Sequence, residues 1–126
     1  MRKQYHFWPA EQGAVDAWDV DRLIALSRDL PIERVAVDAI GDIDTPYWFD
    51  GSDAVPTVRK IVEHVRLISQ VDVSYPIILG PDGRVMDGMH RIARALLEGR
   101  PVIEAVRFTA LPEPDYRGCS PDELPY

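Results

Sequence analysis

The chain has 126 residues, of which 46% are hydrophobic and 28% charged, the size and composition of one ordinary globular domain. Its 21 acidic and 14 basic side chains give a formal net charge of −7, which disfavours nonspecific binding to nucleic acid or to an anionic membrane. Cys119 is the single cysteine, so an internal disulfide and a zinc site made of several cysteines are excluded. No apolar run is long enough for a membrane span or a signal peptide. We therefore expect a cytoplasmic protein without a membrane partner.

The first half of the chain predicts an extended N-terminus, one helix and one strand. Residues 1–9 are expected to form an edge strand or an extended arm. Residues 19–28 carry a helical apolar pattern that begins at a plausible N-cap, Asp19. Residues 33–40 alternate in the manner of a strand. We expect residues 41–53, rich in Asp and Gly, to form a loop.

An aromatic cluster, Tyr47-Trp48-Phe49, lies within this predicted loop. Two interpretations are open: the cluster packs on the surface of the domain, or it forms one wall of a ligand site.

The clearest predicted helix spans residues 57–70, with Thr57 as its N-cap. Its apolar residues recur at helical spacing and are expected to face the core: Val58, Ile61, Val62, Val65 and Ile68. His64 borders this stripe. It is expected either to pack beside the aromatic loop or to face His90.

A strand, a tight turn and a second strand are predicted at residues 75–79, 80–83 and 84–86. A helix follows, with Asp87 as the expected N-cap and Gly99 at its end. The last strand is expected at residues 102–108, with four residues as core contributors: Val102, Ala105, Val106 and Phe108. We divide the chain into a domain of residues 1–108 and an acidic, proline-rich tail of residues 109–126 that wraps the domain or stays mobile.

The segment that opens the predicted helix after residue 86 has the chemistry of an anion site. A helix start offers unpaired backbone N–H groups and partial positive charge. Gly88 lets a ligand approach the backbone, and His90, Arg91 and Arg94 add donors on the following turn. The alternative is that Asp87 is only a cap and that the basic residues are a solvated helix face. Asp87 would repel a phosphate unless its carboxylate faced its own backbone or held a Mg²⁺ ion shared with the ligand.

The run of residues 75–99, YPIILGPDGRVMDGMHRIARALLEG, resembles the signature of the ParB/sulfiredoxin superfamily. Members share a hairpin that leads into a helix start which binds nucleotide phosphates. The resemblance implies an α+β fold with a mixed sheet and two main helices packed on it. It assigns nucleotide binding to residues 87–91 (Asp87, Gly88, Met89, His90 and Arg91) together with Arg94, with ATP, ADP or CTP as the nucleotide and Mg²⁺ as a further candidate.

Two branches of this superfamily fit the chain poorly. Sulfiredoxins have a catalytic cysteine directly before the His-Arg pair, where this chain has Met89, so we do not expect sulfiredoxin activity. Partition ParB proteins carry a downstream helix-turn-helix domain, for which residues 109–126 are too few.

A third branch, the free-serine kinases, uses an Asp-Gly-His-His-Arg motif and an acidic base before the preceding long helix. Asp87, Gly88, His90 and Arg91 match this motif, and Met89 replaces its first histidine. The resemblance implies a small phosphotransferase for a hydroxylated small molecule. Candidate catalytic residues are Asp42, Asp44 and His64, although the family usually has Glu at the position of the base.

Two other functions remain open. One is a non-catalytic nucleotide-binding adaptor or regulatory module, with the acidic tail and the aromatic cluster as interaction surfaces. The other is a DNA-associated protein, which is disfavoured by the acidic charge although arginines concentrate in the second half of the chain. No spacing supports a metal site, including a His6, His64 and His90 combination. The sequence leaves a homodimer open.

Overall fold

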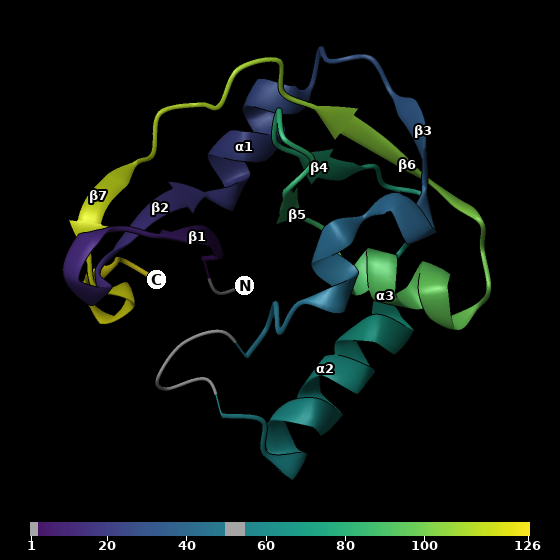
Figure 1. Cartoon of the computed structure of the whole chain (residues 1–126), viewed down its shortest axis with the longest axis horizontal. Coiled ribbons are helices and arrows are strands. Elements are labelled where there is room, and N and C mark those ends of the chain that lie inside the picture. The colour runs from purple at the N-terminus through teal and green to yellow at the C-terminus, as the bar shows by residue number, and fades with distance from the viewer. Residues whose placement is uncertain (1–2, 50–54) are drawn as a thin grey trace.

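The computed structural model describes residues 3–49 and 55–126 and consists of two β-sheets with three α-helices around them (Figure 1). The α+β class predicted from the sequence is confirmed. Of the predicted loop at residues 41–53, the part from residue 50 onward lies outside the described residues. No helix in the described part of the chain has the length and apolarity needed to cross a membrane.

The larger sheet confirms the four strands expected from the sequence. In spatial order it contains β3 (Glu33–Ala36), β6 (Val102–Arg107), β4 (Ile77–Leu79) and β5 (Val85–Asp87). β4 runs parallel to β6, and the other neighbours are antiparallel, so the sheet is mixed. The strand expected to reach residue 40 ends at Ala36 and continues as a 3₁₀ turn, Val37–Ala39.

Helix α3 (Met89–Leu97) closes the core against this sheet. Its inward residues, Met89, Ile92 and Ala95, are spaced three residues apart and all are buried. They pack with buried strand residues such as Ile77 and Val85 in one apolar cluster. In β6, Ile103, Ala105 and Val106 are buried together with the following Phe108. The expectation for Val102 was wrong, since its side chain is 37% exposed at the outer end of the strand.

Helix α2 (Val58–Gln70) begins as predicted, with the Thr57 hydroxyl accepting a hydrogen bond from the Lys60 N–H. Its packing was predicted wrongly. No residue of α2 is buried, and its main contact is with α3 rather than with a sheet. Figure 1 shows α2 projecting from the body of the molecule on the far side of α3. The sequence pattern identified an apolar face but not what covers it.

A second, three-stranded sheet contains β1 (Tyr5–Pro9), β2 (Val15–Asp19) and β7 (Tyr116–Cys119). The expected N-terminal strand is therefore present, while β2 and β7 were not predicted. Helix α1 (Val20–Ser27) continues directly from β2, and the Asp19 carboxylate accepts from the Asp21 N–H as its N-cap. Val20, Leu23 and Ser27 are buried on its inner face, whereas Ile24, expected on the same face, is 45% exposed.

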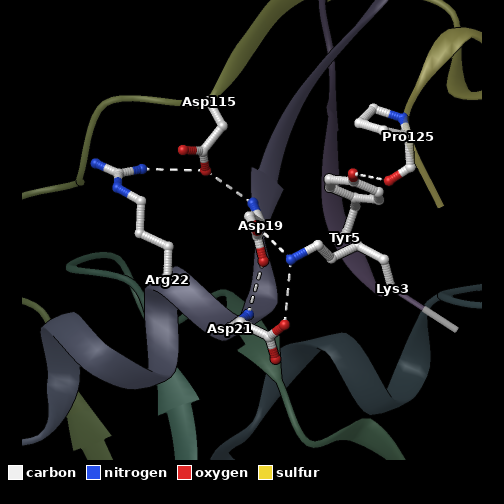
Figure 2. Close-up of polar contacts among 7 residues, drawn as sticks. All are labelled: Lys3, Tyr5, Asp19, Asp21, Arg22, Asp115 and Pro125. Carbon is white, nitrogen blue, oxygen red and sulfur yellow. Dashed lines mark hydrogen bonds and ion pairs between the residues drawn. The ribbon is translucent and has the colours of Figure 1, made fainter. Parts of the chain in front are cut away.

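The C-terminal tail wraps the domain, one of the two outcomes expected for it. Figure 2 shows Asp115 accepting from the Asp19 N–H and from Arg22, at 2.8 and 3.1 Å. Lys3 joins the same cluster through ion pairs with Asp19 and Asp21, and the Tyr5 hydroxyl donates to the Pro125 carbonyl at 2.6 Å. The two ends of the described chain are thus tied into one sheet.

Candidate functional site

The turn between β5 and α3 is where the sequence predicted an anion site. Asp87 is the last residue of β5, and Gly88, not Asp87, is the N-cap of α3. Gly88 has φ = 107°, a left-handed conformation that side-chain-bearing residues rarely adopt. A Cβ atom at this position would lie 2.7 Å from the Cγ2 atom of Ile77. The glycine is therefore required by backbone conformation and by close packing on β4.

Arg91 is held inside the protein by the same turn. Its guanidinium donates to the Asp87 carboxylate at 2.9 Å and to the carbonyls of Tyr75 and Pro76 at 3.2 and 3.0 Å. Both charged side chains are largely buried. Burial raises the pKa of Asp87, an effect that the Arg91 charge opposes. Arg91 thus clamps the start of α3 to the segment before β4, and most of its donors are engaged.

Arg94 serves the end of a different helix. Its guanidinium donates to the carbonyl of Ser69 at 2.6 Å and to that of Val71 at 3.5 Å, and its Nε atom contacts Glu98 at 3.4 Å. A guanidinium at the carbonyl end of α2 satisfies acceptors that have no partner within the helix. Arg94 therefore connects α2 to α3, and it does so at the end of α2 farthest from Thr57.

Two histidines meet at the first turn of α3. The Nδ1 atom of His64, on α2, lies 2.8 Å from the Nε2 atom of His90. The Trp48 ring stacks over both imidazoles, with ring centroids 4.2 Å from His64 and 4.6 Å from His90. Phe49 meets His64 edge-on at 5.5 Å. We call Trp48, His64 and His90 the imidazole stack. It joins three segments that are distant in the sequence.

Both imidazoles favour the neutral form. Burial, together with the nearby His64, lowers the pKa of His90 to about 4. Burial also lowers the pKa of His64, against the opposing charge of Glu63. Near neutral pH, one ring therefore donates a hydrogen bond to the other, and each ring keeps one further nitrogen for other partners.

The aspartates predicted as catalytic bases lie in a short 3₁₀ turn, Gly41–Asp44, before the stack. The Asp42 carboxylate accepts from the Val85 N–H at 2.8 Å, and the Tyr47 hydroxyl donates to the Val85 carbonyl at 2.9 Å. Burial raises the pKa of Tyr47, so its hydroxyl stays protonated as a donor. These two bonds fasten the loop to the edge strand β5. Asp44 is exposed on the same turn.

Met89 begins α3 directly before His90, and its side chain is buried in the core cluster, so only its backbone N–H can serve the predicted site. His6 packs against Trp18, with ring centroids 5.5 Å apart, in the three-stranded sheet. Within residues 3–49 and 55–126, no group of three or more His, Cys, Asp or Glu side chains is placed to hold a metal ion.

Part of this geometry was predictable from the sequence. Contacts of His64 with the aromatic loop and with His90 were expected as alternatives, and the structure contains both. Nothing in the sequence distinguished Trp48 from its two aromatic neighbours. The available signal was weak: a loop aromatic and two histidines separated in sequence but expected on adjoining elements.

Comparison of the chain with protein-family models, with curated proteins and with solved structures found no match.

Proposed function

We propose that this chain is a nucleotide- or phosphate-binding domain of the ParB/sulfiredoxin type that transfers a phosphoryl group to a hydroxylated small molecule. The observation that supports the proposal is the convergence of Trp48, His64 and His90 at the N-terminal end of α3. A helix N-terminus attracts anions, and an adjacent pair of neutral imidazoles can exchange a proton with a bound substrate.

In this proposal, phosphate is held by backbone and imidazole donors rather than by arginine. The first-turn N–H groups of Met89, His90 and Arg91 have no acceptor within the helix. The Arg91 guanidinium stays on Asp87 and on the carbonyls before β4. Its pairing with Asp87 matters, because the neutralised carboxylate no longer repels an incoming phosphate. A nucleotide would bring Mg²⁺ on its phosphate oxygens.

His64 is the proposed general base. In the tautomer in which His64 Nδ1 donates to His90 Nε2, the Nε2 atom of His64 carries a lone pair. It takes the proton of the substrate hydroxyl while that oxygen forms a bond to the terminal phosphorus. The bond from this phosphorus to the bridging oxygen breaks, and the nucleotide leaves one phosphate shorter. Asp42 is less suited to this role because it already accepts from the Val85 N–H, whereas the exposed Asp44 is the remaining acidic candidate.

The test begins with binding. Titration calorimetry of the full chain with ATP, ADP, CTP, GTP and pyrophosphate, each with and without Mg²⁺, should give saturable binding of at least one ligand. A ligand that binds the native state also raises the melting temperature. The absence of binding by all five ligands would refute the proposal.

Turnover separates the roles of the residues. We expect His64→Gln to retain nucleotide binding and to lose about 100-fold or more in phosphoryl transfer. The matched control is Arg66→Gln, two residues further along α2 and without an ion pair among the described residues. If His64→Gln keeps full activity, His64 is not the base.

A second candidate function is a nucleotide-binding adaptor without catalysis. It is favoured by the exposed apolar side chains of α2 and α3, which suit a protein partner better than a small molecule. Nucleotide binding without turnover of any acceptor hydroxyl would support the adaptor over the phosphotransferase.

A further inference from the structure

Helices α2 and α3 share an exposed apolar face on the side away from the sheets. We call it the α2–α3 face and define it by six exposed side chains: Val58, Ile61, Val62, Val65, Leu96 and Leu97. Val58 and Leu97 are the most exposed, at 80% and 79%. Between the helices runs an open groove of about 680 Å³, whose lining includes Ile68 and Ala93.

Helix α2 is poorly supported in the isolated chain. It has 13 residues, and none of them is buried. A helix of this length is marginal by itself in water, because most helical stability in proteins comes from packing an apolar face. The contacts that hold α2 are the imidazole stack on one side and the Arg94 cap at its end. The apolar stripe is only partly covered by α3: Ile61, Val62 and Val65 keep about half of their surface exposed.

The size of the face fits a protein–protein interface. Its six side chains expose on the order of 600 Å² of apolar surface, which is at the upper limit for a typical monomer. A standard interface buries about 800 Å² on each partner. The apolar face and its polar rim therefore provide enough surface for one stable isologous contact.

The charges at the edges of the face are of both signs. On the α2 side, Arg59 and Arg66 lie one on each side of Glu63 and give this edge a net positive charge. None of the ion pairs among the described residues involves either guanidinium. On the α3 side, Glu98 contacts Arg94 and Arg100 and remains partly exposed. A two-fold axis running along α2 would place the α2 edge of one copy over the α3 edge of the other. Arg66, on the half of α2 nearer to its capped C-terminal end, would then meet the Glu98 of the other copy.

We propose that the α2–α3 face binds a second copy of this chain and that the protein is a symmetric dimer. The two-fold axis passes through the groove, and α2 of each protomer packs on α3 of its partner. The dimer supplies the burial that α2 lacks in the isolated chain. It also fixes the position of His64, whose helix would otherwise be held mainly by the stack and the Arg94 cap.

The test measures the mass of the full chain under reducing conditions by sedimentation velocity over a range of concentrations. We expect a dimer that dissociates on dilution. Val65→Glu places an unpaired charge in the interface. Because the dimer is symmetric, the substitution is present in both protomers and introduces two such charges. We expect its dissociation constant to rise about 100-fold, which is a tenfold effect on each half. Leu67→Glu, on the opposite side of the same helix, should leave the dissociation constant unchanged.

Hydrogen exchange tests the same interface in the unmodified protein, so the result does not depend on whether a variant folds. In the unmodified protein, exchange of the α2 amides should slow as the concentration rises, while exchange in β4 and β6 should not change. A monomer at every concentration would overturn the proposal and leave the face to a different partner. A dimer that survives Val65→Glu, or α2 exchange that does not depend on concentration, would overturn it as well.

Discussion

His64 and His90 share one hydrogen bond of 2.8 Å between α2 and α3, and both rings lie against Trp48. The bond requires one donor and one acceptor, so it exists only while at least one ring is neutral. Two positive rings at this distance would repel each other. The contact between the two helices is therefore sensitive to protonation.

The lowered pKa of His90 provides a direct test of this pair. Removing the other ring in His64→Gln eliminates its charge and opens the stack to water. We therefore expect the pKa of His90 to rise from about 4 toward 6.5. NMR titration of the imidazole C–H signals measures this change, and the chain has only three histidines to assign. An unchanged pKa would show that the pair is not coupled as described.

Gly88 and Gly99 provide a matched pair of substitutions at positive φ. A Cβ at Gly88 would meet Ile77 at 2.7 Å, whereas nothing lies within 4 Å of a Cβ at Gly99. Gly99→Ala should cost about 1 kcal/mol from backbone strain alone. Gly88→Ala adds a clash with the core and should cost about 2–4 kcal/mol. Urea unfolding measures both values, and equal costs would contradict the close packing of Gly88 on β4.

Elements that depend on neighbouring residues could be predicted from the sequence, whereas elements that depend on contacts between distant residues could not. The hairpin of β4 and β5, helix α3 and the Thr57 cap follow from local patterns, and all were predicted. The pairing of β2 with β7 joins Val15 to Cys119 across most of the chain, and Tyr116–Cys119 shows no apolar alternation. Nothing local indicated that strand.

The candidate site shows the same limit. Asp42 was predicted from its residue type and position to be a catalytic base, and in the folded chain its carboxylate accepts from a backbone N–H in β5. Likewise, Arg91 and Arg94 were expected to be free donors and instead serve carbonyls that only the folded chain brings near. The periodic apolar stripe shows which face of α2 is apolar. Which element packs against that face depends on the tertiary structure, and the sequence pattern does not contain that information.

His6 should make stability depend on pH. Its ring is buried, and its Nε2 atom has no hydrogen-bond partner among the described residues. Burial, together with the nearby Arg84 charge, lowers its pKa to about 4. In the unfolded chain, the pKa of His6 is near 6.5. Between pH 4 and 6.5, His6 therefore binds more protons in the unfolded state than in the folded state. The free energy of unfolding is therefore not reduced by His6 above pH 6.5, where the ring is neutral in both states. It falls by about 3 kcal/mol as the pH drops to 4.

The variant His6→Leu isolates this effect from that of other titrating groups. Asp87, whose pKa is raised, contributes a slope of the opposite sign and is present in both proteins. The difference in unfolding free energy between the two proteins should therefore change with pH only in the range from about 4 to 6.5. Parallel stability curves through that range would contradict the assignment to His6.

The C-terminal tail should be part of the folding unit. The indole N–H of Trp18, a residue only 2% exposed, donates to the Pro112 carbonyl at 2.8 Å, and β7 completes the sheet beside β2.

A chain ending at Phe108 loses β7 and leaves this buried donor without its acceptor, which alone costs about 1–3 kcal/mol. We expect a loss of at least about 3 kcal/mol in urea unfolding followed by tryptophan fluorescence. A chain ending at Leu124 keeps both features but loses the Tyr5 bond to Pro125 and the contacts of Tyr126 with the Tyr5 ring and the Pro121 carbonyl, so it should lose about 2 kcal/mol. Equal stability of the chain ending at Phe108 and the full chain would show that the tail is an independent appendage.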